Sequence, residues 1–202
     1  RDPSRSPSVL PGGVPALPAP PEGFPLIVLF QWQLKGPKMD LVVRQATEAG
    51  VAAVVPVSGE RCVAGASGDA RGDRRARIVR EARQQSGSPI ATEVLPPVSP
   101  SDVPRVWNAL RSGTDPKAVV LTEAPLARTT LHRYLGSGAR SVALAVGPEG
   151  GMTEREIEGL VEAGFERVHF ATNVLRAETC ALYAVAAVQN ALMEIESWQS
   201  KE

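Results

Sequence analysis

The feature of this chain that most restricts its fold is a regular alternation of strand-like and helix-like segments beyond residue 25. Short apolar runs, typical of buried strands, occur at 26–30, 51–57, 90–95, 118–121, 141–146 and 167–170. Helical patterns follow them at 39–49, 74–85, 103–110, 126–135, 153–163 and 179–195. This alternation predicts an α/β fold in which helices cover both faces of a parallel sheet.

Polar residues and glycines mark several predicted helix ends. Asp102 is a candidate cap for the helix over 103–110, because a short carboxylate can accept a bond from a free amide of the first turn. Thr153 and Glu156 have the spacing of a capping box. Gly50 and Gly164 follow the last helical residues, where left-handed backbone is common.

Composition divides the chain into two parts. Eight of its 18 prolines lie in residues 1–25, which carry almost no periodic apolar pattern. We therefore predict a proline-rich, extended and poorly packed segment at 1–25 and a folded domain at 26–202. A chain of 202 residues is long enough to bury a sizeable core in one such domain.

Charge and cysteine content exclude several classes of protein. The 22 basic and 22 acidic residues cancel, so an RNA partner would have to be met by a local basic patch. Cys62 and Cys180 are far apart and lack metal-ligand spacing, so we expect two free thiols and no zinc site or disulfide scaffold. No apolar run is long enough to span a membrane, which predicts a soluble, cytoplasmic protein without a membrane partner.

Two loops carry the strongest functional signal. Residues 146–153 and 173–179 each leave a predicted strand and enter a predicted helix, so both should lie at the carboxyl edge of the sheet, where ligands bind. The first loop lacks the glycine spacing of a phosphate cradle and presents Glu149, which favours hydroxyl, amine or cationic ligands. Taken alone, it is equally well read as a tight turn with glycines at positive φ.

The second loop carries Arg176 and Glu178 just before the closing helix. Such a pair is usually a surface ion pair or a cap, worth less than about 1 kcal/mol. Because the pair lies beside the glycine loop at the edge of the sheet where ligands bind, we favour a role in a ligand-binding site.

Gly-Pro-Glu-Gly-Gly at 147–151, together with Leu-Arg-Ala-Glu-Thr at 175–179, resembles the signature pair of a known family. These are the small-subunit ribosomal RNA methyltransferases that act on N3 of a uridine in 16S RNA, members of the SPOUT superfamily. Further matches occur at 35–40, 45–50, 56–61 and 81–86, and the resemblance covers about residues 26–196.

The resemblance implies a SPOUT-type α/β fold with a C-terminal trefoil knot, an exception to the rule against threaded chains. Its knotted loops would be 121–126, 147–151 and 171–178, and they would hold S-adenosylmethionine. The cofactor-binding residues that it implies are Leu121, Thr122, Glu123, Val146, Gly147, Pro148, Gly150, Gly151, Asn173, Val174, Leu175, Arg176 and Thr179.

The resemblance also implies catalytic roles and a homodimer. Arg176 would stabilise the ionised uracil, Glu178 would orient Arg176, and Glu149 would face cofactor or substrate. Whether a protein group or water takes the N3 proton is left open. The closing helix over 179–195 would form the dimer seam through its alanines, although an ordinary core helix predicts the same stripe.

RNA contacts are expected from basic residues near the first helix and in the arginine-rich segment at 71–83. The predicted RNA-binding residues are Lys35, Lys38, Arg61, Arg74, Arg80 and Gln85. A charge run is also typical of a merely solvated face.

Two departures from the family pattern bear on RNA capture. Family members begin with a PUA-like RNA-binding barrel, where this chain has only residues 1–25. Either the barrel is absent, leaving this segment as its remnant, or the sequence is part of a longer protein. In addition, Gly87 follows Gln85-Ser86 where the family usually has an arginine.

We expect an RNA methyltransferase that uses S-adenosylmethionine and acts on 16S ribosomal RNA or the small ribosomal subunit. The alternative is a non-catalytic knotted module for RNA binding or ribosome assembly. A nucleotide-binding enzyme such as a dehydrogenase is disfavoured, because no dinucleotide fingerprint occurs.

Overall fold

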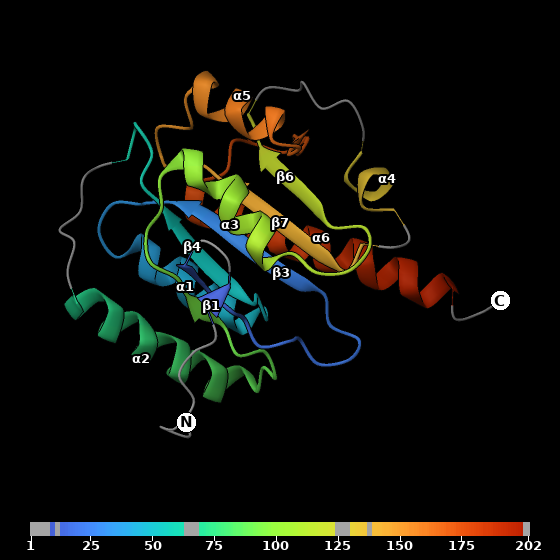
Figure 1. Cartoon of the computed structure of the whole chain (residues 1–202), viewed down its shortest axis with the longest axis horizontal. Helices are drawn as coiled ribbons and strands as arrows, with labels where there is room; N and C mark the ends of the chain where they lie inside the picture. The colour runs from blue at the N-terminus through green and yellow to red at the C-terminus, as the bar shows by residue number, and fades with distance from the viewer. Residues whose placement is uncertain (1–8, 11–12, 63–68, 124–129, 137–138, 200–202) are drawn as a thin grey trace.

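A six-stranded parallel sheet forms the centre of the computed structural model (Figure 1). The structure describes residues 9–10, 13–62, 69–123, 130–136 and 139–199, without the side chains of 9, 69–71 and 194–199. The strands are β3 (Leu26–Trp32), β4 (Ala53–Val57), β5 (Glu93–Val94), β6 (Lys117–Leu121), β7 (Ser141–Val146) and β8 (Glu166–Val168). Their order across the sheet is β5-β4-β3-β7-β6-β8, which confirms the predicted α/β class.

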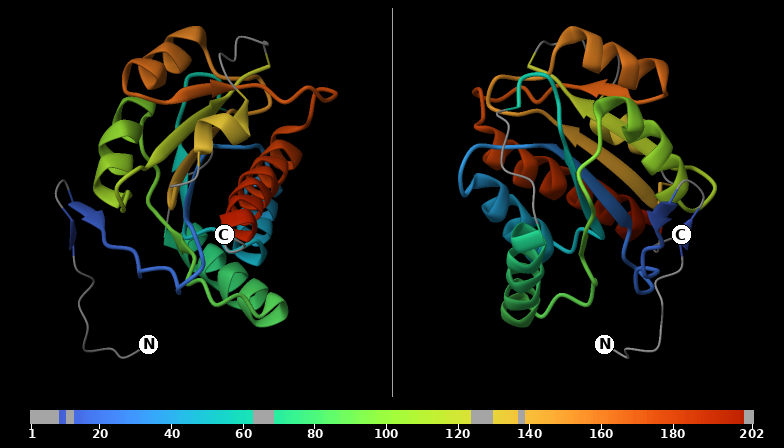
Figure 2. Two further views of the ribbon diagram at one scale, coloured as in Figure 1. Left: turned by 90° about the vertical axis from the view of Figure 1, so that its right-hand side faces the viewer. Right: turned by 60° about the vertical axis from the view of Figure 1, so that its left-hand side comes forward.

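Helices cover both faces of this sheet, as predicted (Figure 2). They are α1 (Lys38–Glu48), α2 (Asp69–Ser86), α3 (Val103–Leu110), α4 (Leu131–Leu135), α5 (Glu154–Glu162) and α6 (Ala177–Gln199). The buried residues of α1, α2, α4 and α6 share one core cluster, and those of α3 and α5 share the other. The molecule therefore has three layers.

Strand β3 explains why the apolar runs of this chain are continuous instead of alternating. Every residue of β3 is buried. Ile27 and Leu29 face the layer of α1 and α6, whereas Val28, Phe30 and Trp32 face the layer of α3 and α5. A strand with helices on both sides needs apolar side chains in both directions.

Helix ends agree with the predictions at the start of α5 and after α1 and α5, where Gly50 and Gly164 have φ angles of 75° and 95°, and differ at the starts of α3 and α4. The capping box of Thr153 and Glu156 is present at the start of α5. Asp102 makes no side-chain cap bond, because a 3₁₀ turn, η2 (Pro100–Asp102), leads into α3 and the Asp102 carboxylate accepts hydrogen bonds from Ser99 and Arg105 instead. Helix α4 starts after Thr130, whose backbone is extended and whose side chain caps the helix, so the helix predicted over 126–135 is not continuous through Thr130. The first part of that prediction, 126–129, lies outside the described residues.

The proline-rich segment is better packed than predicted. Strands β1 (Val9–Leu10) and β2 (Val14–Pro15) form a small antiparallel sheet. Val14 is buried, and Leu10 and Leu17 pack against the core cluster that includes α3. The relation of this segment to a barrel stays a prediction.

The path expected for a knot is only partly described. Strand β7 lies between β3 and β6, and α6 crosses back to pack against α1 on the other face from α5. Residues 124–129, in the loop that the C-terminal segment would thread, lie outside the described residues. The trefoil knot therefore stays a prediction.

Within the described ranges, no helix combines the length and apolar character needed to cross a lipid bilayer. In the same ranges, no three His, Cys, Asp or Glu side chains gather as they would around a metal ion.

Candidate functional site

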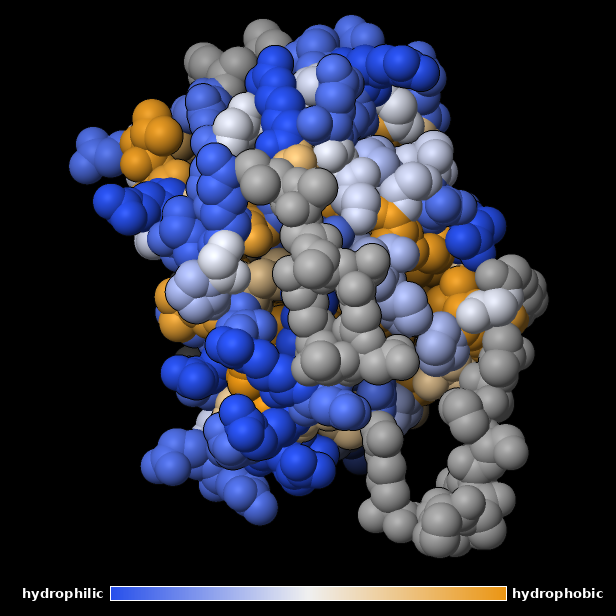
Figure 3. Space-filling view, turned by 90° about the vertical axis from the view of Figure 1, so that its left-hand side faces the viewer, coloured by the Kyte–Doolittle hydropathy of each residue, from blue (hydrophilic) through white to orange (hydrophobic). Residues whose placement is uncertain are grey.

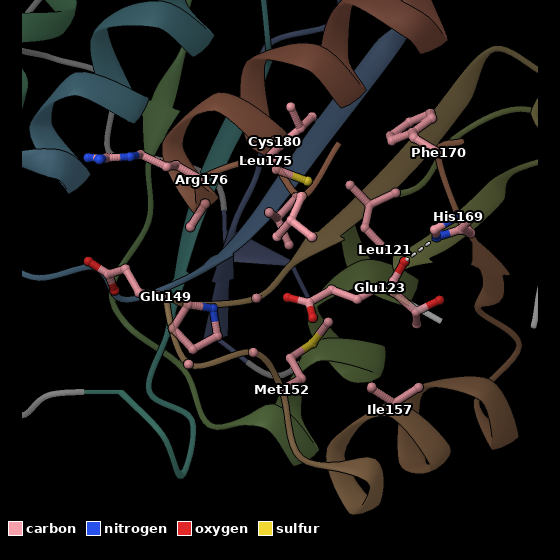
Figure 4. Close-up of a pocket in the computed structure, with 18 of the residues that line it drawn as sticks. Leu121, Glu123, Glu149, Met152, Ile157, His169, Phe170, Leu175, Arg176 and Cys180 are labelled. Carbon is pink, nitrogen blue, oxygen red and sulfur yellow. Dashed lines mark hydrogen bonds between the residues drawn. The ribbon is translucent and has the colours of Figure 1, made fainter. Parts of the chain in front are cut away.

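A cavity of about 560 Å³ lies at the carboxyl ends of β6, β7 and β8 (Figure 4). All the predicted cofactor-binding residues except Thr179 line it, so segments near 121, 147 and 174 meet in one place. Thr179 is exposed and lies outside the lining. The volume is within the range of roughly 300–1,000 Å³ that small-molecule sites occupy.

The glycine loop is a tightly folded wall of this cavity. The Gly151 amide donates to the Pro148 carbonyl over 2.9 Å, and Gly151 has a φ of 70° that disfavours other residues. A Cβ on Gly147 would meet the Met152 backbone nitrogen at 3.2 Å. The loop is thus a tight turn, in which only Gly151 of its three glycines has a positive φ, and the same turn lines the cavity.

Glu149 is held as a negative charge at the edge of the cavity. Its Oε1 accepts hydrogen bonds from the Lys35 amide (3.2 Å) and from Lys38 Nζ (3.0 Å). Burial, the largest single influence, raises the pKa of this carboxyl, but these donors and its own backbone amide together hold the pKa below the ordinary value. At neutral pH Glu149 is thus a stable carboxylate and a weak base.

Lys38 joins two of the predicted catalytic residues. Its Nζ lies 3.9 Å from Glu178 Oε2 as well as 3.0 Å from Glu149 Oε1. The Glu178 side chain is only 13% exposed, and the lysine ammonium supplies an opposite charge beside it. Lys38, predicted as an RNA contact, therefore also organises the site.

Arg176 is not oriented by Glu178 in this structure. Glu178 lies in the first turn of α6, whereas Arg176 precedes the helix, and residues two positions apart do not share a helix face. The Arg176 side chain is exposed, has no hydrogen-bond or ion-pair partner among the described residues, and points away from the centre of the cavity (Figure 4). Its guanidinium is free to meet a ligand at the mouth.

The inner wall of the cavity is largely apolar. Leu121, Met152, Ile157, Leu175 and Cys180 contribute side chains to it (Figure 4). Burial, and secondly the nearby Glu123 carboxylate, raise the pKa of the Cys180 thiol to about 11. Cys180 is therefore an uncharged wall residue at neutral pH and no nucleophile.

The end of β8 supplies lining residues that the sequence interpretation missed. His169 Nδ1 lies 3.2 Å from the Thr122 carbonyl and so links the ends of β8 and β6 (Figure 4). The Phe170 ring packs edge-on against Tyr183 of α6, with ring centroids 5.0 Å apart. The signal was available, because the strand predicted at 167–170 ends at the same edge as the two signature loops.

The predicted RNA-binding residues fall into two groups. Lys38 and Arg61 line the cavity, and Arg61 Nη1 donates to the Gly150 carbonyl over 3.1 Å. Lys35 reaches the same region through its backbone. The second group lies along α2, where hydrophilic residues cover the lower part of the face shown in Figure 3, and comprises Arg74, Arg80 and Gln85.

Within that second group, only Arg74 has an ion pair in the described part of the chain. Its Nη2 lies 2.7 Å from Asp40 Oδ2 on α1. Arg80 and Gln85 are exposed and lie roughly 9 and 16 Å further along the helix axis, from the rise per residue. Neither touches the cavity.

Comparison with known proteins places this geometry in a family. The profile of the RNA methyltransferase domain matches residues 22–189, and the chain belongs to this family. A protein of Aquifex aeolicus named ribosomal RNA small subunit methyltransferase E is 33% identical over 178 residues, which cover 85% of this chain and 70% of that protein. The protein of the same name from Mycobacterium tuberculosis is 34% identical over 173 residues, which cover 81% of this chain and 63% of that protein.

Solved structures agree with this assignment. The ribosomal RNA small subunit methyltransferase E of Neisseria gonorrhoeae, bound to S-adenosylmethionine, superposes with a TM-score of 0.71 at 31% identity over 82% of this chain and 65% of its own. A putative methyltransferase of Legionella pneumophila in complex with S-adenosylmethionine gives a TM-score of 0.71 at 29% identity, over 83% of this chain and 67% of its own. The chain thus spans about two thirds of the length of these relatives.

A more distant likeness bears on the fold alone. The SpoU methyltransferase AviRb of Streptomyces viridochromogenes has a TM-score of 0.55 at 13% identity. The arrangement of sheet and helices is therefore that of the SPOUT methyltransferases.

Proposed function

We propose that this protein transfers the methyl group of S-adenosylmethionine to N3 of a uridine in small-subunit (16S) ribosomal RNA. The observation that carries the proposal is the convergence of the two signature loops on one cavity, in a chain of the RNA methyltransferase family. Because the chain spans only part of its relatives, substrate and activity are proposals for this protein.

The cavity suits the proposed cofactor. Its inner wall can take the apolar parts of the molecule, and the backbone groups of 121–123 and 146–151 offer donors and acceptors to an adenine ring. When bound, S-adenosylmethionine supplies a methyl group already activated by a positively charged sulfur. The Glu123 carboxylate points into this site and the Glu149 carboxylate lies at its edge, and both negative charges complement a cation (Figure 4).

The acceptor base must lose its N3 proton as the new bond forms. We propose that Arg176, whose guanidinium has no partner among the described residues, stabilises the ionised uracil at the mouth of the cavity. The Glu149 carboxylate already accepts hydrogen bonds from the Lys35 amide and from Lys38, so its proposed part is electrostatic. The N3 proton is taken up by hydroxide or a buffer base from the solvent as the guanidinium stabilises the ionised uracil. Glu178 acts through Lys38, by keeping the lysine ammonium at the mouth.

RNA would be held beside the mouth by charge. Lys35, Lys38 and Arg61 lie near the glycine loop, and Arg74, Arg80 and Gln85 extend this surface along α2. Neutralising phosphates dominates such affinity and makes it fall with salt. A ribosomal substrate would place the protein in the cytoplasm.

A homodimer through α6 is also proposed, with Ala186 and Ala187 as the alanines of the expected seam that are not buried. Ala177, Ala181, Ala184 and Ala191 are buried against the chain's own core. The outer face of α6 instead carries Leu182, Tyr183 and Met193, which are 37, 43 and 68% exposed. Leu182 and Met193 share one face of the helix and Tyr183 lies about a quarter turn away, and exposed apolar side chains gathered in this way are typical of an interface between subunits.

The test is methyl transfer from labelled S-adenosylmethionine to small ribosomal subunits and to 16S RNA. Nucleoside mass spectrometry and the block that N3-methyluridine imposes on reverse transcription would identify the product. We expect Arg176→Ala to lower kcat by about a hundredfold, as loss of one charge-stabilising donor does. Exposed Arg111, on the other face of the sheet, provides the matched control.

Two results would redirect the proposal. Tight binding of S-adenosylhomocysteine without methylation of either RNA substrate would favour the non-catalytic RNA-binding or assembly module. Binding of NAD in place of S-adenosylhomocysteine would refute both readings.

A further inference from the structure

The side chain of Gln31 is a buried polar group at the base of the cavity wall. Gln31 lies in β3 opposite Val146 of β7 and has no exposed surface. Its Nε2 donates to three carbonyls, those of Trp32 (3.0 Å), Val146 (3.3 Å) and Gly147 (3.2 Å). Val146 and Gly147 are the first residues of the glycine loop.

The surrounding carbonyls determine how this amide is oriented. An amide nitrogen has two hydrogens, so the three carbonyls share two N–H donors. If the amide were turned by 180°, its oxygen would face all three carbonyl oxygens, which is unfavourable. Oε1 consequently points the other way, where it has no hydrogen-bond partner among the described residues. A buried acceptor without a partner is unfavourable, and an apolar side chain would suit this central strand better if packing alone mattered.

Gln31 does not line the cavity, but two of the three carbonyls that it holds, those of Val146 and Gly147, belong to residues that do. The loop leaves little freedom to absorb a shift, because the Gly147 α-carbon is packed against the Met152 backbone and Gly151 is bonded back to Pro148. A change in the direction of the Gly147 carbonyl would therefore move the whole wall.

We propose that Gln31 is a positioning residue, which holds the first two peptide units of the glycine loop in the conformation that binds the cofactor. This inference rests on the proposed function, because it names what sets the affinity of that same site. Gln31 touches neither cofactor nor RNA and acts through the backbone of Val146 and Gly147.

The test compares Gln31→Met, which keeps the length of the side chain but removes both polar groups, with Thr92→Val. Thr92 is also buried and donates its hydroxyl to the Val51 carbonyl over 2.7 Å, but at the opposite end of the neighbouring strand β4. Each variant thus loses a buried bond from a side chain to a backbone carbonyl. Calorimetry with S-adenosylhomocysteine gives the affinity, thermal unfolding gives Tm, and hydrogen exchange reports the amides of 147–152.

We expect Gln31→Met to weaken S-adenosylhomocysteine binding about tenfold, the effect of losing roughly one net hydrogen bond. Exchange at 147–152 should rise while Tm changes little. Thr92→Val should lower Tm and leave both affinity and loop exchange unchanged. Wild-type affinity and exchange in Gln31→Met, or equal weakening in Thr92→Val, would overturn the inference.

Gln31→Glu provides a second route with a pH readout. Among three carbonyls the carboxyl can donate a hydrogen bond only when it is protonated, so the affinity of this variant should fall as pH rises, more steeply than that of the wild type. A pH profile parallel to the wild type would contradict the proposal. If the wild type itself binds no S-adenosylhomocysteine, the proposed function fails, whereas loop exchange in Gln31→Met still decides whether Gln31 positions the loop.

Discussion

Glu156 connects three segments around the site, and its removal gives the sharpest test of the structure. Its Oε1 accepts hydrogen bonds from Trp32 Nε1 (3.1 Å) and from the Glu60 amide (3.0 Å). Its Oε2 accepts from the Thr153 amide (2.7 Å) and the Thr153 hydroxyl (3.1 Å). One carboxylate thus ties the end of β3 and the loop after β4 to the exit of the glycine loop.

The loss in free energy of unfolding caused by Glu156→Ala depends on whether water can replace the carboxylate at each of its hydrogen-bond donors. Trp32 is fully buried, so its indole N–H would be left without a partner, at a cost of about 1–3 kcal/mol. Losing the glutamate half of the capping box adds about 0.5–1 kcal/mol. The Glu60 amide is exposed and can bond water instead. We expect the free energy of unfolding to fall by about 1.5–4 kcal/mol, or Tm by roughly 3–16 °C in a domain of this size.

The pH dependence of this loss has a definite sign. Burial is the largest influence on Glu156 and raises its pKa, but the donors named above outweigh it and the net pKa is lowered from 4.5. A carboxyl with a lowered folded pKa contributes stability above its unfolded pKa, and the contribution disappears as pH falls through the folded value. The difference between wild type and Glu156→Ala should therefore be complete at pH 7 and shrink below about pH 4.5.

Urea unfolding at pH 7 and pH 4 measures both quantities. The exposed Glu158, on the same helix and without a partner among the described residues, is the control, and Glu158→Ala should change the free energy of unfolding by less than about 0.5 kcal/mol. If Glu156→Ala cost no more than this control at pH 7, the assigned hydrogen bonds would not hold the three segments together.

Three further predictions concern charge, reactivity and assembly. Lys38→Met should raise the preference for cationic S-adenosylmethionine over neutral S-adenosylhomocysteine by roughly two- to fivefold, because Glu149 and Glu178 lose their counter-charge; unchanged relative affinities in calorimetry would contradict this. Cys180, with a pKa of about 11, should react slowly with iodoacetamide at pH 7.5, and more slowly still with S-adenosylhomocysteine bound, as mass spectrometry can show. Tyr183→Asp should convert a dimer to monomers in sedimentation equilibrium, and an unaltered dimer would exclude this face of α6.

The sequence predicted the architecture well because strands that are buried on both faces consist almost entirely of apolar residues. Strands such as β4 and β7 lie between two layers of helices, so nearly all their positions are apolar and their limits can be read. The signature loops could be placed together for a topological reason, since parallel strands bring their carboxyl ends to one edge. The predicted helix over 126–135 missed the extended backbone of Thr130, because the threonine that caps α4 lies inside a pattern that reads as continuous in the sequence.

Pairings inside the site were less predictable. Arg176 and Glu178 are close in sequence and opposite in charge, which suggested a pair, but the start of α6 between them directs their side chains apart. Glu178 instead meets Lys38, which is 140 positions away in the chain. No local pattern shows such a contact, because it depends on how α1 and α6 pack together.

The polar residues beneath the loops carry a broader implication for how the site is built. The sheet determines where the glycine loop begins, but the loop's conformation is held by Gln31 from β3 and by Glu156 from α5, neither of which lines the cavity. Both side chains bond residues at the two ends of the glycine loop, and neither lines the cavity. Loss of either side chain should therefore change the shape of the cavity wall without removing a contact to the ligand. Substitutions at these positions should therefore act on cofactor affinity, whereas substitutions of Arg176 at the mouth should act on turnover. This separation follows from the contacts, because Gln31 and Glu156 bond the glycine loop, whereas Arg176 belongs to the second signature loop, just before α6.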